Sequence, residues 1–429
     1  MGRSGNALHR DDRLETEGAA PVHANQTKPY AFIVCFGIVS MLMDTVYEGA
    51  ISVQGPLLSS FGANAFVVGL VSGLGEATAL GGRLFSGPLA DRTGRYWSFA
   101  ILGYAATAIA VPAMGFAGSL VAVAALVIFE RLGKSIRTPS RDAMISHASS
   151  AVGRGKGFAM HEVMDQIGAM AGPLAVSALL GLTGNDYRVA LGLLVIPGIA
   201  AICVLLALRR RVPNPSAYEN ERGPVAAGPG GNRGKAPTQA PAEKTLRLPC
   251  AFWLYSLGCA TMLAGVATFG VISFHMVSAG VASDAAVPAI YAIAMAIDGA
   301  AAALVGVLYD KLGTRTLLCL PFVCAAIPLF AYGTSIAFVA IGVALWGVSL
   351  GIQESTMRAA VSDLVPSDAR ATAYGTFSVM TGVGSLLGGV IAGSLYTVSP
   401  VLLMGCVAVI EAGALALLVR AMSPAAHTL

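Results

Sequence analysis

The chain has 429 residues, of which 55% are hydrophobic and 12% charged, and 51 are glycine. This composition is too apolar and too rich in glycine for an ordinary soluble domain, so it indicates a membrane protein. The formal charge of +4 is explained by basic residues that mark the cytosolic side of a membrane protein, as described below. It gives no reason to expect a nucleic-acid partner.

The first 28 residues mix acidic and basic side chains without an apolar segment, which is typical of a solvated tail and not of a cleavable signal. From residue 29 onward, twelve stretches are long and apolar enough to cross a bilayer, which takes about 20 residues. We therefore predict an all-α membrane protein with twelve transmembrane helices. The predicted spans are residues 29–51, 65–86, 96–117, 119–140, 157–181, 188–208, 250–276, 285–308, 314–333, 335–358, 372–396 and 400–422.

Residues 209–248 are the longest polar interval, opening with three arginines and rich in proline and glycine. Such a segment cannot offset the entropy of a packed fold, so it predicts a flexible linker that divides the spans six and six. The predicted units are a tail (1–28), an N-terminal six-helix bundle (29–208), the linker (209–248), a C-terminal six-helix bundle (249–422) and a second tail (423–429).

The distribution of basic residues predicts the orientation of the chain. With the N-terminus in the cytosol, Arg188 is the one basic residue left on the opposite side, as the positive-inside rule favours. We expect a multi-pass protein of the cytoplasmic (inner) membrane with both termini in the cytosol and lipid as its solvent.

A charged motif after the second predicted span recurs in the second half. Gly87-Pro-Leu-Ala-Asp91-Arg92-Thr-Gly94-Arg95-Tyr96 is echoed by Gly306-Val-Leu-Tyr-Asp310-Lys311-Leu-Gly313-Thr-Arg315, 219 residues after Gly87. A second pair, Val163–Gly172 and Val379–Gly388, lies at an offset of 216. We predict a short charged turn at each copy of the first motif. The repeats further predict two pseudo-symmetric bundles with a substrate site near mid-membrane between them.

The first motif matches the pattern G-x-L-x-D-x-x-G-R, so the chain resembles the major facilitator superfamily of transporters. Tyr96 departs from the base that many members carry. In the fifth span, Gly168-Ala-Met-Ala-Gly172-Pro173 resembles part of a motif of drug and proton antiporters, although Val176 and Ser177 replace its following glycines. The chain also resembles a prokaryotic branch without an assigned substrate. The resemblance implies secondary transport, with a gate formed by Gly87, Asp91, Arg92, Gly94, Arg95, Gly306, Asp310, Lys311, Gly313 and Arg315.

By this resemblance, Asp91 and Arg95 brace the cytosolic ends of neighbouring helices in the outward-open state; simple solvation of a turn is the alternative. Gly168, Gly172 and Pro173 would allow close helix packing and a bend, whether or not they mark an exporter.

Asp44 and Glu48 are four residues apart, so they share a face of the first span. Inserting a charged residue near the middle of a transmembrane helix costs about 2–3 kcal/mol on insertion scales, so Asp44 and Glu48 must face protein or a water-filled cavity. We interpret both as candidate proton carriers; the alternative is a structural pairing with Arg131. Glu76 and Asp298 are further candidate acids in the second and eighth spans.

The fourth span carries acidic and basic residues along one stripe. Glu130 and Arg131 are the deeper pair, and Arg131 resembles an arginine that lines the cavity in this superfamily. Lys134, Arg137 and Arg141 are interpreted as a gate or a positive-inside face; if they faced the cavity, they would favour an anionic substrate. Glu162 and Asp165, with His161, are predicted to form ion pairs with these bases.

We therefore predict a monomeric secondary transporter, and not an enzyme, that exports a small molecule in exchange for protons. Uptake by symport and a transporter-like sensor or assembly factor remain as alternatives. We expect no cofactor and no metal site, because neither metal-ligand spacing nor a phosphate-binding loop is present, and the seven cysteines lack paired spacing.

Overall fold

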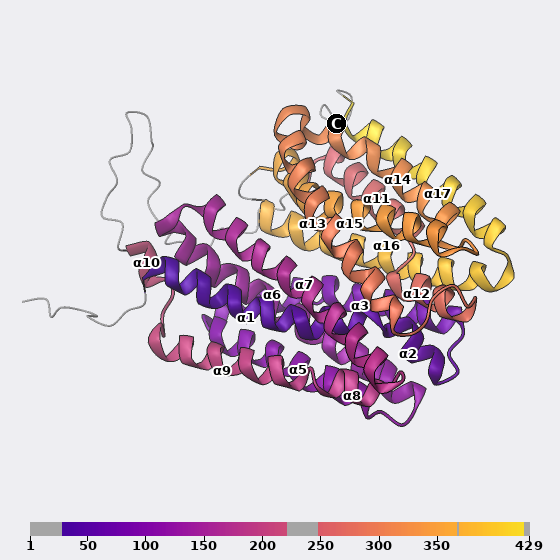
Figure 1. The fold of residues 1–429 in the computed structure, drawn as a ribbon. Coiled ribbons are helices and arrows are strands. Elements are labelled where there is room, and N and C mark those ends of the chain that lie inside the picture. Colours follow the sequence, from indigo (N-terminus) through magenta and orange to yellow (C-terminus); the bar gives the residue numbers. More distant parts are fainter. Residues whose placement is uncertain (1–27, 221–247, 367–368, 424–429) are drawn as a thin grey trace, which may run out of the picture.

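The computed structural model describes residues 28–220, 248–366 and 369–423, and within these ranges it consists of helices without a β-strand (Figure 1). The α-helices are α1 (Pro29–Ser52), α2 (Gln54–Ser60), α3 (Ala65–Gly81), α4 (Arg83–Thr93), α5 (Tyr96–Gly115), α6 (Leu120–Val152), α7 (Arg154–Thr183), α8 (Tyr187–Gly192), α9 (Val195–Arg211), α10 (Ala217–Asn220), α11 (Cys250–Gly265), α12 (Phe269–Ser278), α13 (Ala286–Leu312), α14 (Leu320–Ala331), α15 (Ile336–Leu364), α16 (Arg370–Val398) and α17 (Pro400–Ala421). One 3-10 helix, η1 (Gly313–Cys319), joins α13 to α14.

Ten stretches of the described chain are long and apolar enough to cross a membrane. One of them, Ala286–Ala331, contains α13 and α14 and so covers two predicted spans. Helix α6 covers the predicted fourth span but is not among the ten, and it is the helix that carries the stripe of charged residues. An all-helical membrane fold is thus present, and the count of twelve remains a prediction that requires α6 to cross as well.

Four predicted spans are interrupted in the structure: the second is divided between α3 and α4, and the ninth begins as η1 and continues as α14. The seventh breaks into α11 and α12, because Val266 and Thr268 take extended backbone conformations. The indole N–H of Trp346 donates a 3.2 Å hydrogen bond to the carbonyl of Ala267 within this break. The sixth span is divided between α8 and α9.

The hydrophobic cores follow the two halves of the sequence. One core takes all its buried residues from 32–218, and another takes all of its own from 252–421. Figure 1 shows the indigo-to-magenta helices and the orange-to-yellow helices gathered on opposite sides of the molecule. A third core contains Ala169 of α7 together with residues 267–407, so it lies where the halves meet.

Glycines bring the backbones of the two halves into direct contact. A Cβ atom added to Gly69 of α3 would collide with the carbonyl oxygen of Gly389 on α16, and the reverse also holds. In the same way, a Cβ atom on Gly55 of α2 would collide with the carbonyl oxygen of Gly270 on α12. These contacts require residues without side chains.

The charged motif is not the turn that the sequence led us to expect. Residues 87–93 form the last part of α4, and 306–312 form the last part of α13. The chain leaves each helix at a glycine with positive φ, Gly94 at 62° and Gly313 at 61°, a conformation that glycine adopts without steric cost.

The N-terminal half extends into the predicted linker. Helix α9 continues to Arg211, Val212 accepts a 3.1 Å hydrogen bond from the indole of Trp97, and Tyr218 is fully buried against Phe32. The tail residues 1–27 and 424–429 and linker residues 221–247 lie outside the described residues.

Candidate functional site

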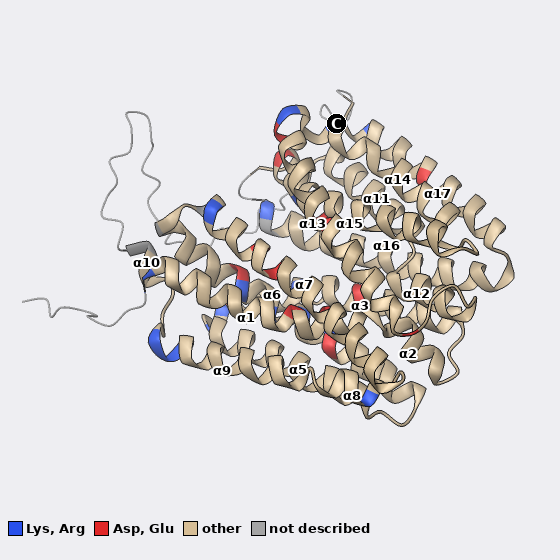
Figure 2. Cartoon of the chain, viewed as in Figure 1, with Lys and Arg blue, Asp and Glu red and all other residues tan. Residues whose placement is uncertain are grey.

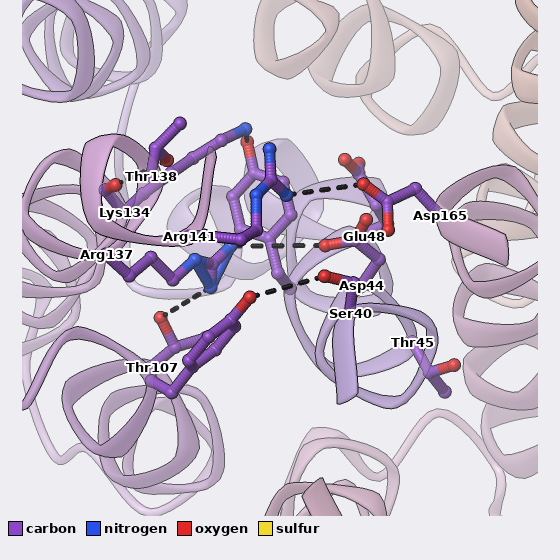
Figure 3. Close-up of polar contacts among 12 residues, drawn as sticks. Ser40, Asp44, Thr45, Glu48, Thr107, Lys134, Arg137, Thr138, Arg141 and Asp165 are labelled. Carbon is purple, nitrogen blue, oxygen red and sulfur yellow. Dashed lines mark hydrogen bonds and ion pairs between the residues drawn. The ribbon is translucent and has the colours of Figure 1, made fainter. Parts of the chain in front are cut away.

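Charged residues gather between α1, α6 and α7, whereas most of the ribbon elsewhere is uncharged (Figure 2). Asp44 lies in α1 and faces α6, where its Oδ1 atom is 4.0 Å from Nη2 of Arg137 (Figure 3). The buried Arg137 also donates a 3.4 Å hydrogen bond to Thr107 of α5. The alternative pairing of Asp44 with Arg131 is therefore not what the structure shows, because Arg131 has other carboxylate partners.

Arg131 is buried between two acids. Its Nη2 atom is 3.1 Å from Glu76 of α3, and its Nε atom is 3.8 Å from Glu130. Glu130 in turn accepts a 3.2 Å hydrogen bond from Thr107. A Cβ atom on Gly75 would lie 3.1 Å from Cγ of Arg131, so the arginine lies directly against the backbone of α3. Glu130, Arg131 and Glu76 thus form one ionic group, in which the two α6 residues are buried and Glu76 is partly exposed.

Tyr47 of α1 is surrounded by three cations of α6. Arg131 and Lys134 both donate to its hydroxyl. The Nζ atom of Lys134 is 4.0 Å from the ring centroid, and the Cζ atoms of Arg131 and Arg137 are 4.9 and 5.7 Å from it. Such positions are attractive because the ring face carries negative charge. Among the described residues, no carboxylate lies within the 4.0 Å ion-pair distance of Lys134, so its close polar contact is the Tyr47 hydroxyl.

His161 and Asp165 of α7 together connect this helix to α1 and α6. The Nδ1 atom of His161 is 3.3 Å from Oδ2 of Asp165, which is also 3.3 Å from Nη1 of Arg141. The Nε2 atom of His161 is 2.9 Å from the hydroxyl oxygen of Ser40 on α1. Figure 3 shows Arg141 directed toward Asp165. The expected ion pairing of α7 with α6 is therefore present for Asp165, whereas Glu162 is exposed and pairs with no described cation.

Two acids make hydrogen bonds from one half of the chain to the other. Oε2 of Glu48 accepts a 2.6 Å hydrogen bond from the phenol of Tyr291 on α13. Oδ2 of Asp298, which is 2% exposed, accepts a 3.0 Å hydrogen bond from the amide of Gln166 on α7. Oδ1 of Asp298 is buried and has no partner among the described residues. Both acids are therefore placed where relative movement of the halves would change their surroundings.

The motif residues predicted to form a gate lie on the surface. Asp91, Arg92, Gly94 and Arg95 are exposed, and Asp91 accepts a 3.0 Å hydrogen bond from Tyr96. No ion pair links these side chains to another described residue. In the second copy, Asp310, Lys311 and Arg315 are likewise exposed. The remaining glycines of the two copies, Gly87, Gly306 and Gly313, are partly buried.

The glycines of α7 lie against α1. A Cβ atom on Gly168 would collide with the carbonyl oxygen of Met41, and one on Gly172 with that of Thr45. Pro173 continues within α7, where it removes one backbone donor. These residues set how closely the helix bearing His161 approaches the helix bearing Asp44.

Sequence reasoning missed five residues of the site, namely Ser40, Tyr47, Thr107, Gln166 and Tyr291. Tyr47 lies between Asp44 and Glu48, and Gln166 directly follows Asp165, so both had a signal in their position beside singled-out acids. Tyr291 had none, because it is one aromatic residue in an apolar span, and its role depends on the approach of α13 to α1.

A cavity of about 10 Å³ lies beside these groups, lined among others by Tyr47, Gln54, Glu130 and Arg131. That volume holds one water molecule. Within the described residues, no three His, Cys, Asp or Glu side chains are grouped as metal ligands. The arrangement thus brings buried acids and bases together between α1, α6 and α7, with two acids at the contact between the halves.

Comparisons with known proteins agree with this architecture. The family model of the Major Facilitator Superfamily matches residues 33–327 and 282–428 of the chain. A protein of Mycobacterium tuberculosis is 49% identical over 370 residues, which is 86% of this chain and 88% of that one. An MFS-type transporter of Methanocaldococcus jannaschii is 27% identical over 402 residues, covering 90% and 94%. The crystal structure of a bacterial homologue of the human lysosomal transporter Spinster, in an inward-facing and occupied conformation, superposes with a TM-score of 0.65 at 17% identity, covering 92% and 97%.

Proposed function

The chain belongs to the Major Facilitator Superfamily, so it is a multi-pass secondary transporter and not an enzyme, and we propose that it exports a small molecule in exchange for protons. The proposal comprises twelve spans in two six-helix bundles in the cytoplasmic membrane, with both termini and the linker in the cytosol. The bundles rock about a central site, which opens to one side of the membrane at a time. The protein works as a monomer, with a solute and protons as its partners and no cofactor.

The observation that carries proton coupling is the pair of hydrogen bonds that cross between the halves. A carboxylate accepts a stronger hydrogen bond than a neutral carboxyl group does. Protonation of Glu48 therefore weakens its bond from Tyr291, and protonation of Asp298 weakens its bond from Gln166. Proton uptake at these acids would then loosen the contact that holds this arrangement of the halves.

Contacts at one end of the molecule support an inward-facing state. Gly55 lies against Gly270, and Ser177 donates a 2.6 Å hydrogen bond to the carbonyl of Ala285, beyond the mid-membrane acids. With the N-terminus in the cytosol, this closed end faces outward. The stretch from Gly168 through Pro173 resembles part of the antiporter motif, and this resemblance favours export over uptake.

The proposal is tested by measuring the flux of a compound across a liposome membrane under a controlled proton gradient. A thermal-shift screen of small molecules on the purified protein supplies a compound, which is then loaded into liposomes containing the protein. We expect its exit to accelerate when the outside is made acidic and to lose this acceleration in Glu48→Gln and Asp298→Asn. Accelerated entry in the direction of the proton gradient would instead indicate symport. Absence of both flux and counterflow for every stabilising compound would indicate the non-transporting alternative.

A further inference from the structure

Glu411 of α17 is a buried acid outside the groups described above. The residue is 2% exposed, and neither of its carboxylate oxygens has a hydrogen-bond partner among the described residues. No described cation lies within ion-pair distance of it either. A charged carboxylate in the interior of a membrane protein is costly unless something compensates it, so this position calls for a positive partner.

The carboxylate lies at the break between α11 and α12. A Cβ atom on Gly265, the last residue of α11, would collide with Oε1 of Glu411, so this oxygen lies against the end of that helix. The last carbonyl groups of an α-helix lack intrahelical donors and carry partial negative charge. Three residues further on, the hydroxyl of Thr268 is also buried without a partner.

The break is held open by contacts with other helices. Trp346 of α15 donates to the carbonyl of Ala267, and a Cβ atom on Gly388 of α16 would lie 2.6 Å from the carbonyl oxygen of Val266. These contacts keep the backbone at the break from closing into a continuous helix. Interrupted helices with free carbonyl groups are a recurrent way for transporters to bind Na⁺ or protons.

We propose that Glu411 and the end of α11 form a binding site for Na⁺ in the C-terminal half. One carboxylate balances one positive charge, which favours a monovalent ion over a divalent one. The carbonyl groups at the end of α11 supply further oxygen ligands, and the Thr268 hydroxyl is available at the same break. A proton on Glu411 is the other way to neutralise this charge, and the titration below distinguishes it from Na⁺.

The test uses Trp346, whose indole is bonded to the break. The full-length protein in detergent is titrated with NaCl near neutral pH, with choline chloride keeping the total salt constant and KCl in a parallel series. We expect a saturable rise of a few degrees in melting temperature and a change in Trp346 fluorescence with Na⁺, both at least tenfold weaker in apparent affinity with K⁺. Both Na⁺ effects should be lost in Glu411→Gln.

Two further variants keep the result interpretable. Trp97→Phe combined with Trp253→Phe should retain the fluorescence change, which assigns that change to Trp346, the remaining tryptophan. Glu354→Gln, which removes an exposed acid of α15, should retain both effects. Should wild type show no Na⁺ effect, or should Glu411→Gln show the same effect as wild type, Glu411 is a buried neutral acid and the proposal is wrong.

Discussion

The phenol of Tyr291 on α13 donates a 2.6 Å hydrogen bond to the carboxylate of Glu48, and so joins the two halves of the chain near the C-terminal end of α1. Glu48 has no cation within ion-pair distance among the described residues, whereas Asp44, one turn away, faces Arg137. The one hydrogen bond that the Glu48 carboxylate accepts among the described residues thus crosses from one half to the other. This makes Glu48 the acid of α1 whose protonation most directly affects the contact between the halves.

Replacing Glu48 with Gln should separate proton coupling from solute movement. Glutamine is close to the protonated carboxyl group in shape, so the variant permanently mimics the protonated state of Glu48. A hydrogen bond to a charged group contributes about 1.5–3 kcal/mol, so proton-driven export should fall by ~10-fold or more. Solute counterflow without a gradient, measured in the same liposomes, should persist.

Tyr291→Phe serves as the matched variant. It removes the same hydrogen bond from the opposite side but leaves the titrating acid in place, so proton-driven export should be reduced and its dependence on pH retained. If Glu48→Gln and wild type show the same response to the gradient, Glu48 does not carry the coupled proton.

The pair of Asp44 and Arg137 is expected to contribute mainly to stability. Asp44→Asn leaves Arg137 buried without its anion, and we expect a loss of about 3 kcal/mol, the lower end for breaking a buried pair, because the 4.0 Å contact is long. The double variant Asp44→Asn with Arg137→Met should regain most of this loss, as followed by thermal unfolding in detergent. Equal destabilisation by the single and double variants would contradict the pairing.

A second measurement on Asp44→Asn tests its candidate role as a proton carrier. If Asp44 exchanges protons during transport, the pH profile of export should flatten in the variant relative to Arg137→Met alone. An unchanged profile would leave Asp44 as a structural partner of Arg137.

Much of the fold could be predicted because membrane spans are encoded locally. Apolar length and the positive-inside bias indicate a multi-pass helical protein without any knowledge of contacts. The break between α11 and α12 could not be predicted in this way, because the bond from Trp346 to Ala267 joins residues 79 apart in sequence. The helical form of the charged motif was missed because Gly94 and Gly313 were read as parts of a turn, whereas they end helices.

The site shows the same division between local and distant information. Asp44, Glu48, Arg131 and Asp298 could be selected because ionisable residues within apolar spans are conspicuous. Their partners could not be assigned, since helical spacing fixes which residues share a face but not which helix that face meets. Tyr291 is the clearest case: its contact with Glu48 depends on packing between the two halves.

The exposed motif should affect the rate of transport more than binding. Asp91 contacts Tyr96 in this structure, and its proposed bracing partners belong to the opposite, outward-open state. Asp91→Asn should therefore lower the export rate several-fold and leave solute affinity, measured by thermal shift, near that of wild type. Tyr96→Phe removes the local hydrogen bond and should change neither; a rate loss equal to that of Asp91→Asn would assign the role of Asp91 to this local contact.

The contact between α7 and α1 can be tested with one methyl group. Gly168→Ala places a Cβ atom against the carbonyl oxygen of Met41, and relieving this clash must shift two helices that carry the buried charges. Overpacking of this kind costs about 1–3 kcal/mol, so the melting temperature should fall. Gly181→Ala on the same helix meets no atom within 4 Å and should be neutral or stabilising by up to about 1 kcal/mol, because alanine favours the helix. If both variants melt alike, α7 and α1 are not held at the close separation that Gly168 permits, and the distance between His161 and Ser40 must be set by other contacts.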